Sequence, residues 1–266
     1  MYLKTAIILS ACMSISWAQS ALAWGQTGHR VTGEIAQQYL SEQAKAAIAS
    51  ILPNETLAEA STYADEMRSN PDEFWQQVAG PYHYVTVPEG KRYQDVGAPE
   101  KGDAYIALQA FTKTLKDPDA SLASKQLSLR FAIHIIGDLH QPLHAGNGTD
   151  RGGNDVRVQF FREGSNLHRV WDSGLIDRRQ LSYSEWSAWL GSKISDEQAQ
   201  EWMITDPLVY IAESANIRDE IYPLSDELSW RYLYDHIPTV KLRLQQGGVR
   251  IAAYLNDVFD DAGSAN

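Results

Sequence analysis

Apolar residues recur every three or four positions along much of the chain, which is the spacing of one face of an α-helix. In residues 32–52, Ile35 and Tyr39 lie four positions apart, as do Ile48 and Leu52, and Pro53 ends the stretch. We expect further helices at 57–68, 103–115, 124–139, 166–177, 185–190, 198–202, 207–217 and 226–259. In the last of these, Pro238 and Gly247-Gly248 predict interruptions.

Two short stretches depart from the helical pattern. Residues 82–87 are β-branched and aromatic, which predicts an extended segment. Val156, Val158 and Phe160 alternate with polar residues, and Gly164 allows a return strand, so we expect a short β-hairpin. No internal repeat or linker is visible, and the tail after Asp260 is expected to be disordered. The pattern predicts a mainly α, single-domain protein.

The first 23 residues have the features of a signal peptide. Lys4 precedes a mostly apolar run at 5–18, and Ala21-Leu22-Ala23 has the small-x-small form of a cleavage site. We therefore expect export to a periplasm or the exterior, and one domain at 24–266 that begins at Trp24. A buried first helix and lipoprotein cleavage before Cys12 are the alternatives.

Composition limits the chemistry of the remaining chain. Cys12 is the only cysteine and lies in the signal segment, so residues 24–266 contain no disulfide or thiolate metal ligand. No apolar run after the signal segment approaches the ~20 residues that span a bilayer. The net charge of −11, or −12 without Lys4, argues against a basic nucleic-acid binder. Bound metal ions can nevertheless supply local positive charge.

Histidine and aspartate recur at helical spacing between residues 134 and 172. His134 and Asp138 lie four positions apart on a predicted helix, and His168 and Asp172 repeat this spacing. His140 and His144 are also four apart, but Pro142 lies between them, so we expect only one of these two to be a ligand. A single pair of this kind is more typical of a surface or core contact. Their joint occurrence favours a zinc site built from imidazole and carboxylate ligands.

These motifs resemble the trinuclear zinc nucleases specific for single strands, the S1/P1 type, which are related to zinc-dependent phospholipases C. The resemblance covers nearly all of the chain from Trp24. It rests on Trp24-Gly25-Gln26-Thr27-Gly28-His29, the run from His134 to His144, Asp150-Arg151-Gly152-Gly153-Asn154, and His168 with Asp172. It implies a multi-helix fold of the phospholipase C/nuclease type with a short β-hairpin.

The resemblance also implies three zinc ions. One would be bound by the free α-amine and carbonyl oxygen of Trp24, by His29 and by Asp138. A second would be bound by Asp65, His83, His134 and Asp138, so Asp138 would bridge the two. The third would be bound by His144, His168 and Asp172. His140 would donate a hydrogen bond next to a ligand, and His236 matches no motif and is expected to be structural.

Catalytic and substrate-binding roles follow from the same resemblance. Asp65, Asp138 and Asn154 are the expected catalytic residues, with the Asn154 amide donating to the phosphate, although an ordinary turn is the alternative for 152–154. Tyr84 would stack on a base, unless it is a core tyrosine. Thr86 stands where the family usually has an aspartate. Glu89 and Lys91 could orient water or contact phosphate, or lie in a solvated loop.

The resemblance implies an exported endonuclease that hydrolyses single-stranded DNA and RNA to 5′-phosphate products and also removes 3′-phosphates from nucleotides. The expected partners are single-stranded nucleic acid and nucleotides, with a monomeric chain and no stable protein partner. A zinc-dependent phospholipase C is the alternative enzyme, although Asp172 and the 150–154 loop favour a nuclease. A zinc-binding protein without catalysis is the alternative from another class.

Overall fold

The computed structural model describes residues 24–260. The signal peptide at 1–23 and the disordered tail after Asp260 were predicted for segments that lie outside the described residues. Helices dominate the rest, which confirms the mainly α prediction. In the described part of the chain, no helix is long and apolar enough to cross a membrane.

The helical elements range from single turns to a helix of 31 residues. The α-helices are α1 (Gln26–Ala36), α2 (Glu42–Ile51), α3 (Leu57–Ala60), α4 (Tyr63–Glu66), α5 (Tyr93–Val96), α6 (Ala104–Lys116), α7 (Leu122–Asp138), α8 (Leu167–Arg169), α9 (Leu175–Asp177), α10 (Tyr183–Gly191), α11 (Asp196–Trp202), α12 (Pro207–Glu220) and α13 (Trp230–Asp260). Short 3₁₀ or π segments are η1 (Met67–Ser69), η2 (Phe74–Val78), η3 (Gly80–His83), η4 (Pro142–His144) and η5 (Val170–Gly174).

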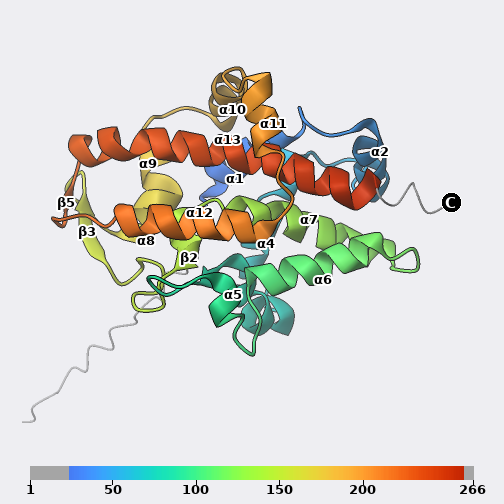
Figure 1. The fold of residues 1–266 in the computed structure, drawn as a ribbon, viewed down its shortest axis with the longest axis horizontal. Helices are drawn as coiled ribbons and strands as arrows, with labels where there is room; N and C mark the ends of the chain where they lie inside the picture. Colours follow the sequence, from blue (N-terminus) through green and yellow to red (C-terminus); the bar gives the residue numbers. More distant parts are fainter. Residues whose placement is uncertain (1–23, 261–266) are drawn as a thin grey trace, which may run out of the picture.

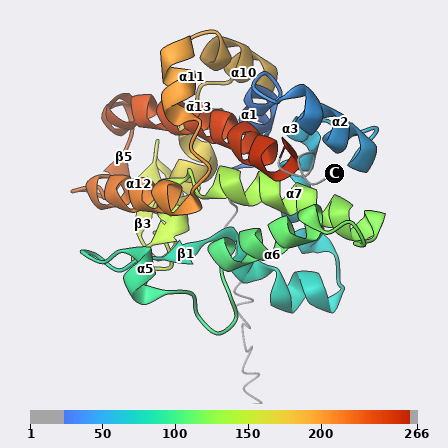
Figure 2. The same ribbon diagram turned by 45° about the vertical axis from the view of Figure 1, so that its right-hand side comes forward.

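The long helix α13 organises the molecule. It packs against α1, α2 and α7, and α6 lies on the other side of α7 (Figures 1 and 2). The pair α10 and α11 covers the outer side of α13, while α12 runs close to the η4 and β2 segments. The central helix α7 is therefore enclosed, and its last eleven residues, from Ser128 to Asp138, are buried except for Arg130.

The structure corrects the predicted interruption of the last helix. α13 runs unbroken from Trp230 to Asp260, so the break predicted at Pro238 and Gly247-Gly248 was wrong. Pro238 is on an exposed face of the helix. It has no N–H for the backbone carbonyl four residues earlier, but water can solvate that carbonyl there. The glycines allow close packing on α1: a Cβ at Gly248 would lie 2.6 Å from the Cβ of Ile35.

Two other predicted helices are broken. The stretch 32–52 is divided into α1 and α2, because Ser41 caps α2 by accepting a hydrogen bond from the Ala44 amide. The stretch 57–68 is divided into α3, α4 and η1. Ser61 and Thr62 donate their hydroxyl hydrogens back to the carbonyls of Ala58 and Glu59, which favours a turn between α3 and α4.

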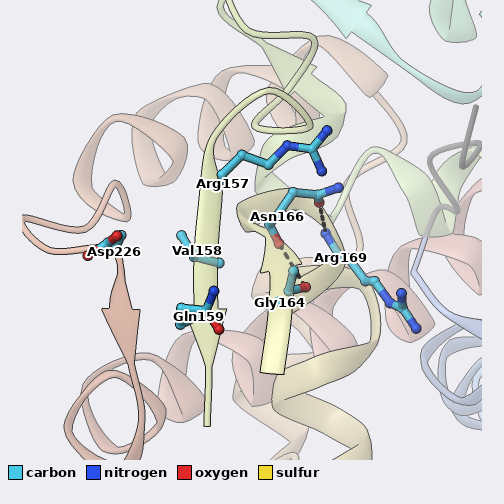
Figure 3. A pocket seen from close by; sticks show the side chains of 8 residues that line it. Arg157, Val158, Gln159, Gly164, Asn166, Arg169 and Asp226 are labelled. Carbon is cyan, nitrogen blue, oxygen red and sulfur yellow. Dashed lines mark hydrogen bonds between the residues drawn. The ribbon is translucent and has the colours of Figure 1, made fainter. Parts of the chain in front are cut away.

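The strands form two small sheets. β3 (Arg157–Phe160) and β4 (Glu163–Asn166) pair antiparallel, which confirms the predicted hairpin, and β5 (Glu227–Leu228) pairs parallel with β3. Figure 3 shows Arg157, Asn166 and Arg169 around a pocket on this hairpin. Within 82–87, only β1 (Val85–Thr86) is a strand, because Pro81 favours a 3₁₀ turn at its start. β1 pairs parallel with β2 (Ala145–Gly146).

The buried apolar residues form two clusters. One is centred on α7 and α6, with Leu129 and Phe131 fully buried. The other joins α1, η5 and α9 with α13, and contains Trp24, Trp171 and Trp186. Because α7 belongs to the first cluster, and α1 and η5 belong to the second, the polar side chains on these elements meet between the two clusters.

Candidate metal centre

Three groups of histidine and aspartate side chains meet at the junction of the two clusters. Within each group, one ligand atom from every residue lies within 4.8 Å of the others. The groups are His29 with His134 and Asp138, then Asp65 with His83 and His134, and finally His144 with His168 and Asp172. The structure thus brings together all eight of the predicted side-chain ligands.

The carboxylate of Asp138 connects the first two groups. Its Oδ1 lies 3.2 Å from His29 Nε2, while its Oδ2 lies 3.1 Å from both His83 Nδ1 and His134 Nε2. The ring nitrogens of His83 and His134 are 2.8 Å apart, and Asp65 Oδ1 lies 3.9 Å from His83 Nδ1. With its two oxygens facing different imidazoles, Asp138 has the geometry of a bridging ligand.

The third group lies next to the first two. His168 Nε2 is 3.2 Å from Asp172 Oδ2, and His144 Nε2 is 3.8 Å from Asp172 Oδ1. His144 Nδ1 lies 3.7 Å from Asp138 Oδ1, so the groups are contiguous. Asp172 lies in the π-helical segment η5, a type of helix distortion that is frequent at functional sites.

Backbone carbonyls fix the orientation of three of these imidazoles. Nδ1 of His134 donates to the carbonyl of Ser61 at 2.6 Å. Nδ1 of His144 donates to the carbonyl of His83 at 2.5 Å, and Nδ1 of His168 donates to the carbonyl of Gly152 at 2.6 Å. Each bond places the hydrogen on Nδ1, so the neutral ring presents the lone pair of Nε2 to the centre, as is typical of metal-binding histidines.

Several of these buried atoms have no hydrogen-bond partner among the described residues. They are both ring nitrogens of His29, Oδ1 of Asp138 and Nε2 of His144. A buried polar atom without a partner is destabilising by roughly 1–3 kcal/mol, so such atoms are rare unless an ion or water satisfies them. The donor set of imidazole nitrogens and carboxylate oxygens fits zinc.

Electrostatics within the three groups agree with this interpretation. Burial, followed by repulsion from neighbouring histidines, holds the pKa values of His29, His83 and His144 well below the usual value, so these rings are neutral. Burial opposes a charge on His134, but Asp138 and Asp65 outweigh it and raise the pKa of His134 to about 9. A metal ion would displace this proton, because metal ligands must be deprotonated.

Trp24, the predicted terminal ligand, lies beside the third group. Its side chain is fully buried in the second apolar cluster. The amide of the next residue, Gly25, donates to the carbonyl of Asp172 at 2.8 Å. The backbone at Trp24 is therefore held close to the helix that carries Asp172.

A cavity of 350 Å³ opens beside the groups, and His83, His144 and His168 contribute to its wall. All three predicted substrate-binding residues, Tyr84, Thr86 and Asn154, also line it. Tyr84 is 48% exposed, so its alternative as a core tyrosine is wrong. The Asn154 amide donates to the carbonyl of Arg151 at 2.9 Å, which closes the turn.

Residues 24–260 match the model of the S1/P1 nuclease family. This chain belongs to that family. It is 31% identical to Endonuclease 4 of Arabidopsis thaliana over 277 residues, which cover 90% of each chain. Nuclease S1 of Aspergillus oryzae and nuclease P1 of Penicillium citrinum are each 28% identical, covering 91% and 88% of this chain, and 94% and 97% of their own lengths. The alpha toxin from Clostridium absonum matches in structure over 91% of this chain and 64% of its own, with a TM-score of 0.48 and 15% identity.

Family membership makes this chain a nuclease, and hence a hydrolase that cuts phosphodiester bonds in nucleic acid. Between the two enzymes considered above, this favours the nuclease over the phospholipase C. The histidines and aspartates could hold metal ions in three places, one for each group.

Two residues of this S1/P1 nuclease become site candidates only in the structure. The side-chain amide of Gln141 donates to Oδ1 of Asp172, while its carbonyl oxygen accepts from the Leu143 amide at 2.5 Å. Arg68 lines the cavity and lies 3.4 Å from Asp65 Oδ1. In the sequence, Gln141 could have been singled out because it follows His140. Arg68 could have been singled out because it lies three residues after Asp65, so that Arg68 and Asp65 share one helical face.

Four further residues considered from sequence are not in the three groups. Nδ1 of His140 donates to the carbonyl of Ile136 at 2.7 Å, and its Nε2 accepts from Arg250 at 3.1 Å. His140 therefore stabilises the contact between the end of α7 and α13, and it does not donate to a metal-ligand side chain as predicted. His236 packs against the rings of Trp171 and Tyr232 as a structural residue. Glu89 and Lys91 are exposed and are not among the residues that line the cavity.

Proposed function

We propose that this nuclease is a zinc-dependent endonuclease that hydrolyses single-stranded DNA and RNA to 5′-phosphate products and removes 3′-phosphates from nucleotides. The observation that carries this proposal is the set of buried ligand atoms on His29, Asp138 and His144 that lack a hydrogen-bond partner, together with an open cavity that His144 lines. A zinc-binding protein without catalysis needs no cavity next to its ligands.

Three zinc ions would be held by the three ligand sets. The α-amine and carbonyl of Trp24, with His29 and Asp138, would hold one ion. Asp65, His83, His134 and Asp138 would hold the next. His144, His168 and Asp172 would hold the third, with the Asp172 carboxylate fixed by Gln141. The fit is supported by ring orientation, since carbonyls hold three of the imidazoles with Nε2 towards the centre.

Zinc at these positions would supply Lewis acidity, which lowers the pKa of water and neutralises charge on the phosphate. The residues of the chain do the remaining work. Asp65, which lies beside the cavity residues Arg68 and His83, would orient the attacking water by accepting a hydrogen bond, while Asp138 would bridge the two neighbouring ion positions. Arg68, at the cavity wall beside Asp65, binds a non-bridging phosphate oxygen. The Asn154 amide donates to another oxygen and helps to hold the phosphate in line.

A single strand is the preferred substrate in this proposal. Tyr84 presents a partly exposed ring at the cavity, and stacking of a base on such a ring contributes about 1–3 kcal/mol. A base in a duplex would first have to leave its stack, which costs a few kcal/mol. Thr86 offers a hydroxyl that donates and accepts, so it tolerates different base edges.

Export and signal cleavage complete the proposal. Removal of residues 1–23 would free the α-amine of Trp24, whose pKa is ordinarily ~7.7–8.0, so that metal can displace its proton near neutrality. We propose that the mature chain is a single domain, acts as a monomer and works in a periplasm or outside the cell.

The experiment that tests this proposal measures zinc content, N-terminal sequence and hydrolysis on the same mature sample. We expect three zinc ions per chain, Trp24 as the first residue, and cleavage of single-stranded DNA well above that of duplex DNA. A chelator should abolish activity and lower the melting temperature together. Three bound zinc ions without hydrolysis of any phosphodiester would refute the enzyme, and release of phosphocholine from phosphatidylcholine without DNA cleavage would favour the phospholipase.

A further inference from the structure

The helix α12 packs against η4 and β2, two segments that contribute residues to the wall of the substrate cavity (Figure 1). One side chain of α12 and one just after the helix reach the segments that form the cavity wall. Arg218 is in the last turn of α12, and Tyr222 follows the helix. Neither residue is among those that line the cavity, so neither is expected to contact substrate.

Arg218 joins the two parallel strands. Its Nη1 donates to the carbonyl of Val87, immediately after β1, at 2.7 Å, and also to the carbonyl of Ala145 in β2. β1 follows His83 and Tyr84, and β2 follows His144, so this one nitrogen bonds to the backbones of two paired segments that both contribute to the cavity wall. The guanidinium is 1% exposed and its charge is balanced by Asp219.

Tyr222 holds the loop that follows β2. Its hydroxyl donates to Oδ2 of Asp150 at 2.5 Å and accepts from the side-chain amide of Asn147 at 3.1 Å. Oδ1 of Asp150 in turn accepts from the Gly153 amide at 3.0 Å. Burial and the neighbouring Asp150 raise the pKa of Tyr222, so the hydroxyl remains protonated and can donate.

A fully buried arginine is expensive to desolvate, and a hydrophobic side chain of the same volume often stabilises a protein equally well. Apart from the bonds of Arg218 to Asp219, the bonds made by Arg218 and Tyr222 end on segments that contribute to the cavity wall, namely 85–87, 145–150 and, through Asp150, 153. Catalytic geometry is sensitive to such support, because a displacement of about 1 Å can lower a rate by ~100-fold.

We infer that Arg218 and Tyr222 are positioning residues, which set the shape of the substrate cavity without lining it. This inference rests on the proposed function, since it assigns the cavity to nucleic acid. Arg218 anchors the ends of the paired strands β1 and β2, and so helps to hold Thr86 at the cavity wall. Tyr222 fixes the 147–154 loop, which carries Arg151 and Asn154.

The test compares Tyr222→Phe and Arg218→Met with the matched controls Tyr234→Phe and Arg231→Met, which change exposed side chains on α13. We expect KM for single-stranded DNA to rise about tenfold in each test variant. A factor of ten in affinity corresponds to the loss of one hydrogen bond to a charged or buried group. Arg218→Lys should restore part of the affinity, because the ammonium can reach one carbonyl. The controls should keep the wild-type KM.

A second measurement does not depend on activity. Hydrogen exchange of the amides of Thr149 and Gly153 should be at least tenfold faster in Tyr222→Phe, while amides in α6 exchange as in the wild type. Asp150→Asn and Tyr222→Phe should be non-additive in KM, because they break the same bond. Zinc content should remain at the wild-type value in Tyr222→Phe.

Wild-type KM and wild-type exchange in Tyr222→Phe would overturn the inference, even if Arg218→Met fails to fold. A wild-type enzyme without zinc-dependent cleavage of single strands would instead refute the proposed function. A purely structural role would lower the melting temperature of the variants and leave KM and loop exchange unchanged, which also contradicts positioning.

Discussion

The side-chain amide of Gln141 donates a hydrogen bond to Oδ1 of Asp172, thirty-one positions further along the chain. Gln141 also caps the η4 turn through the Leu143 amide, and this turn ends at His144. One buried glutamine therefore orients two of the three residues in the third group.

Gln141→Leu should weaken zinc binding by the third group by about 10–100-fold, which is the usual effect of removing a partner of a metal ligand. The measurement is zinc affinity by competition with a chromophoric chelator. Gln94→Leu, at an exposed position, is the control and should bind three zinc ions normally. Equal affinities in the two variants would contradict the positioning of Asp172 by Gln141.

Asp138→Ala should be more damaging than Asp172→Ala. Asp138 faces His29 with one oxygen and His83 and His134 with the other, so its removal affects two ion positions. We expect residual activity on the order of tenfold lower than in Asp172→Ala, with less zinc retained. Equal zinc content and equal kcat/KM in the two variants would argue against bridging.

One extra residue ahead of Trp24 in the mature protein should remove the terminal amine as a ligand. The expected result is loss of one zinc ion per chain and a large decrease in kcat, because the ion that His29 and Asp138 would share with Trp24 loses its amine ligand. Elemental analysis and single-strand cleavage provide the measurement. Full activity with three zinc ions would show that the terminus does not bind metal.

Gly248→Ala should destabilise the fold although alanine is the better helix former by about 1 kcal/mol. A Cβ at this position would lie 2.6 Å from the Cβ of Ile35, and relief of such an overlap costs roughly 1–3 kcal/mol. Thermal or urea unfolding measures the change. Gly164→Ala, where no atom lies within 4 Å of the added Cβ, is the control. A more stable Gly248→Ala would show that α1 and α13 are not in close contact.

Glu213 forms ion pairs with the buried Arg243 and Arg250, and these pairs make the stability of the protein depend on pH in acid. Burial opposes a charge on Glu213, but hydrogen bonds and attraction from both arginines outweigh it and hold the pKa of Glu213 below its usual value. Because this pKa is lowered in the folded state, its stabilisation is present above about pH 4.5 and is lost as the pH falls through the folded value.

Glu213→Gln should therefore unfold more easily at pH 7, by roughly 3 kcal/mol, because two buried guanidinium groups lose their counter-charge. The difference from the wild type should narrow as the pH falls through the lowered pKa of Glu213 and this carboxylate becomes protonated. Urea unfolding at a series of pH values measures both effects. A constant difference across this range would show that Glu213 is not the titrating group.

The sequence by itself determined the local features of this protein. The helical periodicity placed α6, α7 and α12 within a few residues, and the alternation at 156–160 predicted the hairpin. The spacing of four residues placed His134 with Asp138, and His168 with Asp172, on common helix faces. These features depend on neighbours in the chain, and such neighbours are visible in the order of the residues.

Only the tertiary structure decided the remaining features, because they depend on partners far away in sequence. α13 continues through Gly247 and Gly248, since these glycines pack against α1. The role of Gln141 depends on Asp172, and that of Arg218 depends on two strands from other parts of the chain. Local spacing shows which side chains share a face, whereas the packing of distant segments determines what that face meets.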